Sequence, residues 1–127
     1  MAYLDASEWD SGRCQQLGWQ YNFQFGVVRC LPLPNHVIPE LLALVVSRIE
    51  RVTGCPRVAQ VIICDQRPGG GISTHIDYLP AFGSHVTALS LMGWCTYIVY
   101  LAYGVHGDPV RVFIPPRLLV VMKDDAQ

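Results

Sequence analysis

The chain has 127 residues, a length that fits one domain and is too short for two. Hydrophobic residues make up 51% of the chain and charged residues 15%, a balance that predicts a packed globular core and excludes a disordered chain. The formal net charge is −1, so no basic field over the whole molecule attracts nucleic acid. The sequence predicts a single domain over residues 1–127, with residues 1–15 as a flexible start.

The N-terminal ten residues are acidic and contain no apolar stretch of the kind found in signal or transit peptides. No apolar run in the chain approaches the length of a transmembrane helix. We therefore expect a protein of the cytoplasm or nucleus that does not insert into a membrane.

The cysteines are five in number, widely spaced, and without a Cys-x-x-Cys pair. This pattern disfavours a zinc ribbon and a disulfide framework. Cys64 lies inside an apolar run and Cys95 borders another, so buried free thiols are the simpler interpretation.

The first predicted element is a strand at residues 19–25, where aromatic and polar residues alternate. A helix follows over residues 38–52, because apolar residues recur there at helical spacing. Pro39 is suited to the first turn of this helix, and Gly54 and Pro56 end the helix.

The rest of the chain reads as five short strands separated by turns. They are expected at residues 58–64, 85–92, 95–102, 110–114 and 118–122. Strands of this length and spacing are typical of an antiparallel sandwich or barrel. The fold class is therefore α+β and mainly β, with one helix before the strands.

The segment with chemical content is Arg67-Pro-Gly-Gly-Gly-Ile-Ser-Thr-His-Ile-Asp77. If it forms a strand, His75 and Asp77 point to the same face, because they are two residues apart. A second histidine from another strand would complete a 2-His-1-carboxylate triad, which binds non-haem iron(II) and leaves positions open. The pair alone is common by chance, and the alternative is a surface histidine beside a turn-forming aspartate.

The surroundings of this pair resemble the AlkB family of iron(II)/2-oxoglutarate dioxygenases. That family reads Asn-x-Tyr-x-Pro-Gly-x-x-Ile-x-x-His-x-Asp and then Ser-Leu-Ser-Leu-Gly, which residues 64–77 and Ala88-Leu-Ser-Leu91 partly match. Gly18-Trp-Gln-Tyr21 and Ile114-Pro-Pro-Arg-Leu-Leu-Val-Val-Met122 are similar to its start and its later strands. The loop with Ala81-Phe82 is most similar to the branch that hydroxylates modified wobble uridines in tRNA.

The resemblance implies a double-stranded β-helix, or jelly roll, with the N-terminal helix packed on it. It implies iron(II) held by His75 and Asp77, with 2-oxoglutarate as cosubstrate and O2 as oxidant. The expected activity is oxidative demethylation of alkylated bases or hydroxylation of a modified tRNA base, with DNA and RNA substrates both open. Trp19 and Tyr21 could stack on a base of this nucleic acid, and core packing is the alternative for both.

The sequence departs from the family pattern at the residues that help to hold 2-oxoglutarate. Cys64 stands where the family has Asn, and Gln66 stands where it has Tyr. In the family, the distal histidine and the arginines that pair with 2-oxoglutarate follow the stretch that matches Leu118–Gln127. We therefore expect a C-terminally incomplete domain with turnover below the normal rate and marginal stability when expressed alone. A degenerate, non-catalytic AlkB-like module is the second hypothesis.

Other candidates fit ordinary structural roles better. A substitute third ligand is a minor alternative for His85 and a weaker one for His36 and His106, which read as surface histidines. The glycines at 69–71 lack the Lys-Ser/Thr of a phosphate loop and instead predict a tight turn before the metal pair. Solvated surface positions are the simpler interpretation for three arginines: Arg67, Arg111 and Arg117.

Overall fold

The structure, a computed structural model, describes residues 14–22, 29–32, 38–77, 82–100 and 107–123. The chain divides into two compact units, residues 1–81 and residues 82–127, which are described separately. The fold is mainly β with few helices, and its strands form small antiparallel sheets. The α+β, mainly β class is thus confirmed, and the single domain over residues 1–127 stays a prediction.

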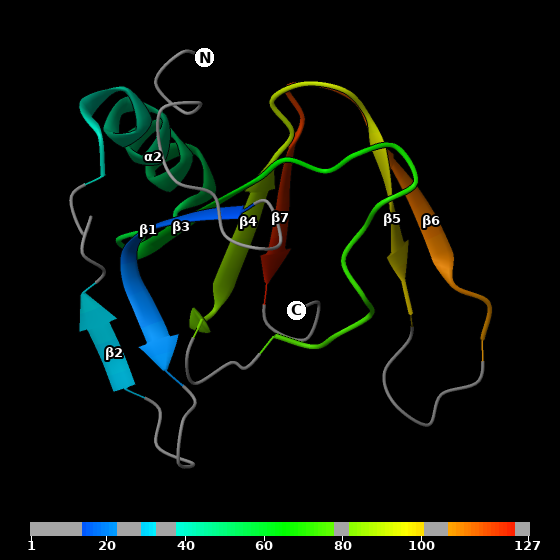
Figure 1. The fold of residues 1–127 in the computed structure, drawn as a ribbon, viewed down its shortest axis with the longest axis horizontal. Coiled ribbons are helices and arrows are strands. Elements are labelled where there is room, and N and C mark those ends of the chain that lie inside the picture. The colour runs from blue at the N-terminus through cyan, green and yellow to red at the C-terminus, as the bar shows by residue number, and fades with distance from the viewer. Residues whose placement is uncertain (1–13, 23–28, 33–37, 78–81, 101–106, 124–127) are drawn as a thin grey trace. The chain divides into compact units, whose positions relative to one another are not determined.

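The first unit contains a three-stranded sheet with the order β2-β1-β3. Its strands are β1 (Cys14–Asn22), β2 (Arg29–Pro32) and β3 (Gln60–Cys64). Residues 14–18 of β1 pair with β3, and residues 19–22 pair with β2 (Figure 1). The predicted strand at residues 19–25 therefore begins five residues earlier, and its last three residues lie outside the described part. Cys14 and Gln15, which the sequence placed in the flexible start, lie in β1, and Gln15 is only 4% exposed.

Gly18 marks the point where β1 changes its pairing partner. Its φ is +87°, in the region that favours glycine. A Cβ added there would lie 2.3 Å from the carbonyl oxygen of Ala59, closer than real Cβ atoms come to a backbone atom. The next amide, that of Trp19, donates a hydrogen bond of 2.9 Å to the same oxygen. Only glycine allows the two backbones to approach this closely here.

Helix α2 (Glu40–Thr53) confirms the predicted helix. Pro39 is the residue before its first turn, one position earlier than expected, with its ψ of 146° still extended. Gly54 ends the helix in the left-handed conformation and donates its N–H to the Glu50 carbonyl oxygen at 3.0 Å.

The apolar stripe of α2 is narrower than the sequence suggested. Four of its residues are half-buried, namely Leu42, Val45, Val46 and Ile49. Leu41 and Val52, which the sequence assigned to the stripe, are 69% and 68% exposed. Both lie on the same margin of the stripe at 100° per residue, so the neighbouring structure covers the centre of the stripe and leaves this margin in solvent.

The glycine-rich segment begins with the expected tight turn. The Gly70 N–H donates to the Arg67 carbonyl oxygen at 2.9 Å, and Gly69 has a φ of +81°. Proline at the second position and glycine with positive φ at the third are typical of a type II turn. Residues 70–77 then run in neither helix nor strand. The expectation that His75 and Asp77 lie on a strand is wrong, because no described strand pairs with this glycine-rich segment to form a hydrogen-bonded ladder.

The second unit consists of two antiparallel strand pairs (Figure 1). β4 (His85–Leu89) pairs with β7 (Leu119–Lys123), and β5 (Cys95–Val99) pairs with β6 (Val110–Ile114). Each of these strands, and β3, corresponds to a predicted strand within a few residues. Short antiparallel strands are confirmed, and their closure into a jelly roll belongs to the proposal below.

The β4–β7 ladder extends through a bulge at Arg117. The Arg117 N–H donates to the Ser90 carbonyl oxygen at 2.7 Å, and the Ser90 N–H donates to that of Leu118 at 3.0 Å. Two residues therefore face one, with Arg117 at a φ of +64° in a position where glycine is usual. Arg117 is exposed, as are Arg67 and Arg111, so the surface interpretation of these arginines is confirmed.

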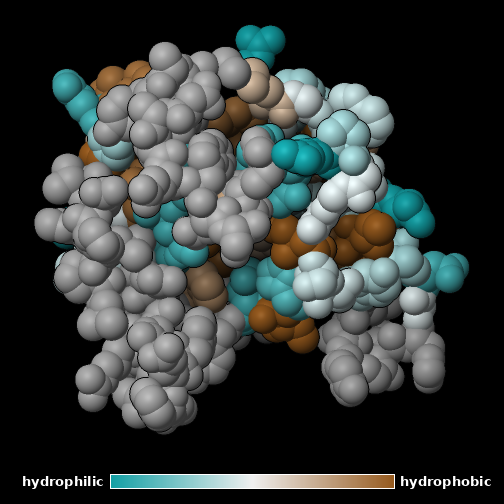
Figure 2. Space-filling model, in the orientation of Figure 1, coloured by the Kyte–Doolittle hydropathy of each residue, from teal (hydrophilic) through white to brown (hydrophobic). Residues whose placement is uncertain are grey.

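The described residues bury little apolar surface. Among them, Ile114 is the one buried hydrophobic residue, at 2% exposure. The Trp94 and Phe113 rings contact each other with centroids 5.8 Å apart, yet the residues stay 72% and 59% exposed. Apolar side chains are accordingly visible at the surface among polar ones (Figure 2). No helix within the described ranges is long and apolar enough to cross a membrane.

Candidate metal centre

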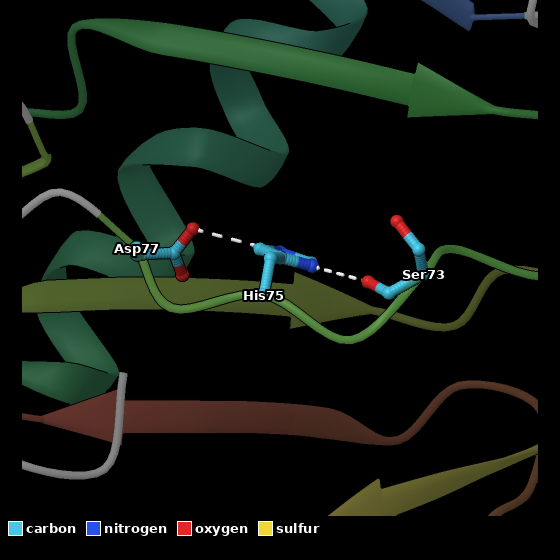
Figure 3. A network of polar contacts seen from close by, with 3 residues as sticks. All are labelled: Ser73, His75 and Asp77. Carbon is cyan, nitrogen blue, oxygen red and sulfur yellow. Dashed lines mark hydrogen bonds and ion pairs between the residues drawn. The ribbon is translucent and has the colours of Figure 1, made fainter. Parts of the chain in front are cut away.

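His75 and Asp77 have side chains that point toward each other (Figure 3). His75 Nε2 lies 3.7 Å from Asp77 Oδ1, and His75 Nδ1 lies 2.7 Å from the carbonyl oxygen of Ser73. The imidazole ring thus lies between the carboxylate and the carbonyl (Figure 3). The i, i+2 spacing brings the two side chains together even though the segment is not a strand.

The Ser73 carbonyl determines which nitrogen of His75 is available. A carbonyl oxygen only accepts hydrogen bonds, so Nδ1 carries the proton and donates it. In the neutral imidazole, the lone pair is then on Nε2, the nitrogen that faces Asp77. Histidines that bind metals are commonly oriented by such a hydrogen bond from the nitrogen that does not bind.

The distance between the two candidate donors is close to what a shared metal requires. Two ligands at right angles, each about 2.1 Å from one metal, lie about 3 Å apart. The separation of 3.7 Å between Nε2 and Oδ1 is about 0.7 Å longer, a difference within reach of small side-chain rotations. A nitrogen and an anionic oxygen also match two members of the 2-His-1-carboxylate set. The pair therefore fits the iron(II) that the resemblance implies.

The exposure of His75 makes the pair accessible to a metal from solvent. It also fits the alternative of a surface histidine beside a turn-forming aspartate. The His75 side chain is 55% exposed and the Asp77 side chain 18%. An exposed histidine in contact with a neighbouring aspartate is also an ordinary surface arrangement. Among the residues that the structure describes, no group of three or more His, Cys, Asp or Glu side chains is placed to hold a metal.

Of the three other histidines, the structure describes His85. His85 begins β4 in the second unit, and its Nδ1 lies 2.8 Å from the hydroxyl of Ser84. His36 and His106 lie outside the described residues. The hypothesis that His85, His36 or His106 replaces the distal histidine as a metal ligand therefore stays a prediction.

The two residues expected to contact 2-oxoglutarate lie at and after the end of β3. Both Cys64 and Gln66 are exposed. The Cys64 Sγ lies 2.7 Å from the Sγ of Cys14, which faces it across the β1–β3 pair. Desolvation and this hydrogen bond raise the pKa of Cys64 to about 12. The thiol of Cys64 thus keeps its proton and already has a partner.

Buried thiols were the wrong expectation for Cys64 and Cys95, since both are exposed. Exposure alternates at the end of β3, where Ile62 and Cys64 are exposed and Ile63 is half-buried. The position of Cys64 in an apolar run therefore did not determine which face of the strand carries its side chain. The pairing of Cys64 with Cys14 was not predicted either, because residues 50 positions apart give no local signal.

Trp19 is 41% exposed, so core packing does not account for its side chain. The side chain of Tyr21, the other residue expected to contact substrate, lies outside the described part of the structure. An exposed indole next to the bend at Gly18 is available to a ligand from solvent.

Comparison with known proteins gives one relative. The chain is 27% identical over 127 residues to the uncharacterized protein L905 of Acanthamoeba polyphaga mimivirus, and the match covers 98% of this chain. It covers 60% of that protein, so the chain spans about three-fifths of the length of this relative. No family model and no solved structure matches the chain.

Proposed function

We propose that the chain is the iron-binding part of an AlkB-like iron(II)/2-oxoglutarate dioxygenase that acts on nucleic acid. The observation that carries the proposal is the convergence of His75 Nε2 and Asp77 Oδ1, with Nδ1 engaged by the Ser73 carbonyl. The Pro-Gly turn before this pair and the short antiparallel strands after it agree with the proposed jelly roll.

His75 and Asp77 would hold iron(II), which supplies oxidation by O2 coupled to decarboxylation of 2-oxoglutarate to succinate. The pair sits on a partly exposed segment, so cosubstrate can approach from solvent. The oxidised group is a methyl or methylene carbon of an alkylated base or of a modified tRNA uridine. The proposed location is the cytoplasm or nucleus.

A second candidate function is that of a non-catalytic AlkB-like module. The contact between Cys64 and Cys14 favours it, because the thiol at the position of the family's Asn is engaged within the sheet. A thiol is also a weaker hydrogen-bond donor than an amide. The two candidates differ in whether residues 64 and 66 contact 2-oxoglutarate.

Restoring the family residues tests this difference. The double variant Cys64→Asn and Gln66→Tyr is expected to bind 2-oxoglutarate about 10-fold more tightly in the presence of iron(II) without oxygen. The reason is that each added hydrogen bond contributes about 0.5–1.5 kcal/mol. Isothermal titration calorimetry measures the affinity. The control is Cys95→Asn, the same change at an exposed cysteine of the second unit, which should leave the affinity unchanged. Equal affinities of the double variant and the unmodified chain would mean that residues 64 and 66 are wrongly assigned to the 2-oxoglutarate site.

The nucleic-acid substrate is proposed from the exposed indole of Trp19. Aromatic faces stack on unpaired bases, and every base offers such a face. The resemblance to the wobble-uridine branch makes single-stranded RNA the substrate class that we favour.

Removing the indole is expected to weaken RNA binding selectively. In Trp19→Ala, affinity for a single-stranded RNA oligonucleotide should fall about 5-fold or more, since one stacked base contributes about 1–3 kcal/mol. Fluorescence anisotropy measures this change. Trp94→Ala, which removes a more exposed indole from the second unit, is the control and should bind as the unmodified chain does. A larger effect at Trp94 than at Trp19 would show that the RNA contact is elsewhere.

A further inference from the structure

Two cysteines far apart in sequence meet at the edge of the first unit's sheet. Cys14 begins β1, Cys64 ends β3, and the two residues are direct partners in the antiparallel register. Their sulfur atoms lie 2.7 Å apart, about 0.7 Å longer than an S–S bond of about 2.0 Å. The register of two strands, and not local sequence, brings them together.

The backbone geometry at this position suits a covalent bond. Residues directly opposite in an antiparallel pair have Cα atoms about 4.5–5.5 Å apart and Cβ atoms about 4.5–5.5 Å apart. A disulfide accepts Cα separations of about 4.4–6.8 Å and Cβ separations of about 3.5–4.5 Å. The Cα ranges overlap and the Cβ ranges meet at about 4.5 Å, so a slight approach of the two Cβ atoms, together with rotation about the Cα–Cβ bonds, would bring the two sulfurs to bonding distance without a change of register.

The two cysteines can be reached from solvent. Cys64 is exposed and Cys14 is half-buried, so a small oxidant reaches the pair. The other described cysteines differ: Cys30 pairs with Tyr21 in the β1–β2 register, Cys55 follows α2, and Cys95 pairs with Ile114 in the second unit, so none of them faces a cysteine in a strand register. We propose that Cys14 and Cys64 are a dithiol modification site that closes into an intramolecular disulfide on reaction with a low-molecular-weight disulfide such as oxidised glutathione.

The reaction balances as two successive thiol–disulfide exchanges. The sulfur of Cys14 attacks one sulfur of oxidised glutathione, forms a mixed disulfide and releases one glutathione thiol. The sulfur of Cys64 then attacks Cys14 Sγ, forms the Cys14–Cys64 bond and releases the second glutathione. The two protons of the protein thiols end on the two glutathione molecules, and the protein loses two electrons. The raised pKa of Cys64 agrees with its acting second, because its thiolate is scarce near neutral pH.

The bond would tie β1 to β3 across 50 positions of sequence. A cross-link over so long a loop restricts the unfolded chain strongly, so oxidation should raise the melting temperature of the first unit by at least about 10 °C. The bond would also withdraw the side chain at position 64 from any contact with 2-oxoglutarate. That last consequence depends on the proposed function, whereas formation of the bond does not.

The test is disulfide mapping by mass spectrometry on the full chain after incubation with oxidised glutathione. We expect a Cys14–Cys64 linked peptide as the main product, reversed by reductant. Cys64→Ser should stop at the mixed disulfide on Cys14, and Cys55→Ser, the matched control, should close as the unmodified chain does.

A second probe does not depend on oxidation. Phenylarsine oxide bridges two neighbouring thiols, so the reduced chain should bind one equivalent that protects Cys14 and Cys64 from alkylation. Cys14→Ser should abolish that protection. Mixed disulfides that never close, linkage of Cys14 or Cys64 to other cysteines, or arsenical bound equally by Cys14→Ser would overturn the proposal. Because both readouts are covalent, a failure of the dioxygenase proposal would leave them unchanged.

Discussion

Replacing His75 or Asp77 with alanine is expected to lower the iron(II) affinity of the chain at least about 100-fold. Loss of a residue that only orients a metal ligand lowers metal affinity about 10–100-fold, and loss of the ligand itself should have a larger effect. The reason is geometric: Nε2 and Oδ1 are 3.7 Å apart, and each is one of the two donors that the described residues bring together. Asp77→Asn should lose most of the affinity as well, because it removes the negative charge while keeping the size of the side chain. Anaerobic calorimetric titration with iron(II) measures these affinities.

Matched variants separate this site from nonspecific binding. Asp108→Ala removes an exposed carboxylate of the second unit and should bind iron(II) as the unmodified chain does. His85→Ala tests the substitute-ligand alternative, and an effect as large as that of His75→Ala would make His85 part of the site. If all of these variants bind iron(II) equally, the pair at residues 75 and 77 is an ordinary surface contact.

Replacing Gly18 with alanine is expected to destabilise the first unit by about 2–5 kcal/mol, enough to unfold a marginal domain. Two effects add at this position. The φ of +87° disfavours any side chain, and the new Cβ would lie 2.3 Å from the Ala59 carbonyl oxygen. Relief requires β1 to move away from residue 59, which breaks the hydrogen bond of the Trp19 amide.

The control for this prediction is Gly71→Ala, because no atom lies within 4 Å of a Cβ added there and its φ is not positive. That variant should change stability by less than about 1 kcal/mol. Chemical denaturation followed by circular dichroism and hydrogen exchange in β1 and β3 measure both. An unchanged midpoint for Gly18→Ala would mean that β1 does not cross from β3 to β2 at this residue.

The sequence predicted the elements well where periodicity was strong. α2 and strands β3 to β7 lie within a few residues of their predicted positions, because apolar spacing and the stops at Gly54 and Gly93 are local signals. The start of β1 was missed, since Cys14 and Gln15 show no alternation that separates a strand from a polar terminus. The exposure of Leu41 and Val52 could not be predicted either, because it depends on which neighbours cover the helix.

The candidate site was predicted in its residues and only partly in its geometry. The i, i+2 spacing of His75 and Asp77 does bring their side chains together, but the segment is not a strand, since pairing depends on a partner elsewhere in the chain. The hydrogen bond that orients His75 is accepted by a backbone carbonyl oxygen, which no side-chain pattern reveals. The partner of Cys64 depends on the β1–β3 register and was likewise outside the reach of local sequence.

The most direct test of the proposed iron(II) and 2-oxoglutarate site is an anaerobic titration of iron(II) into the chain with 2-oxoglutarate present. Chelation of iron(II) by 2-oxoglutarate gives a visible charge-transfer absorption that protein ligands enhance and shift. The proposed function predicts that this band appears with one equivalent of iron(II) per chain and is lost in Asp77→Ala. A spectrum identical for the unmodified chain, Asp77→Ala and a solution without protein would contradict it.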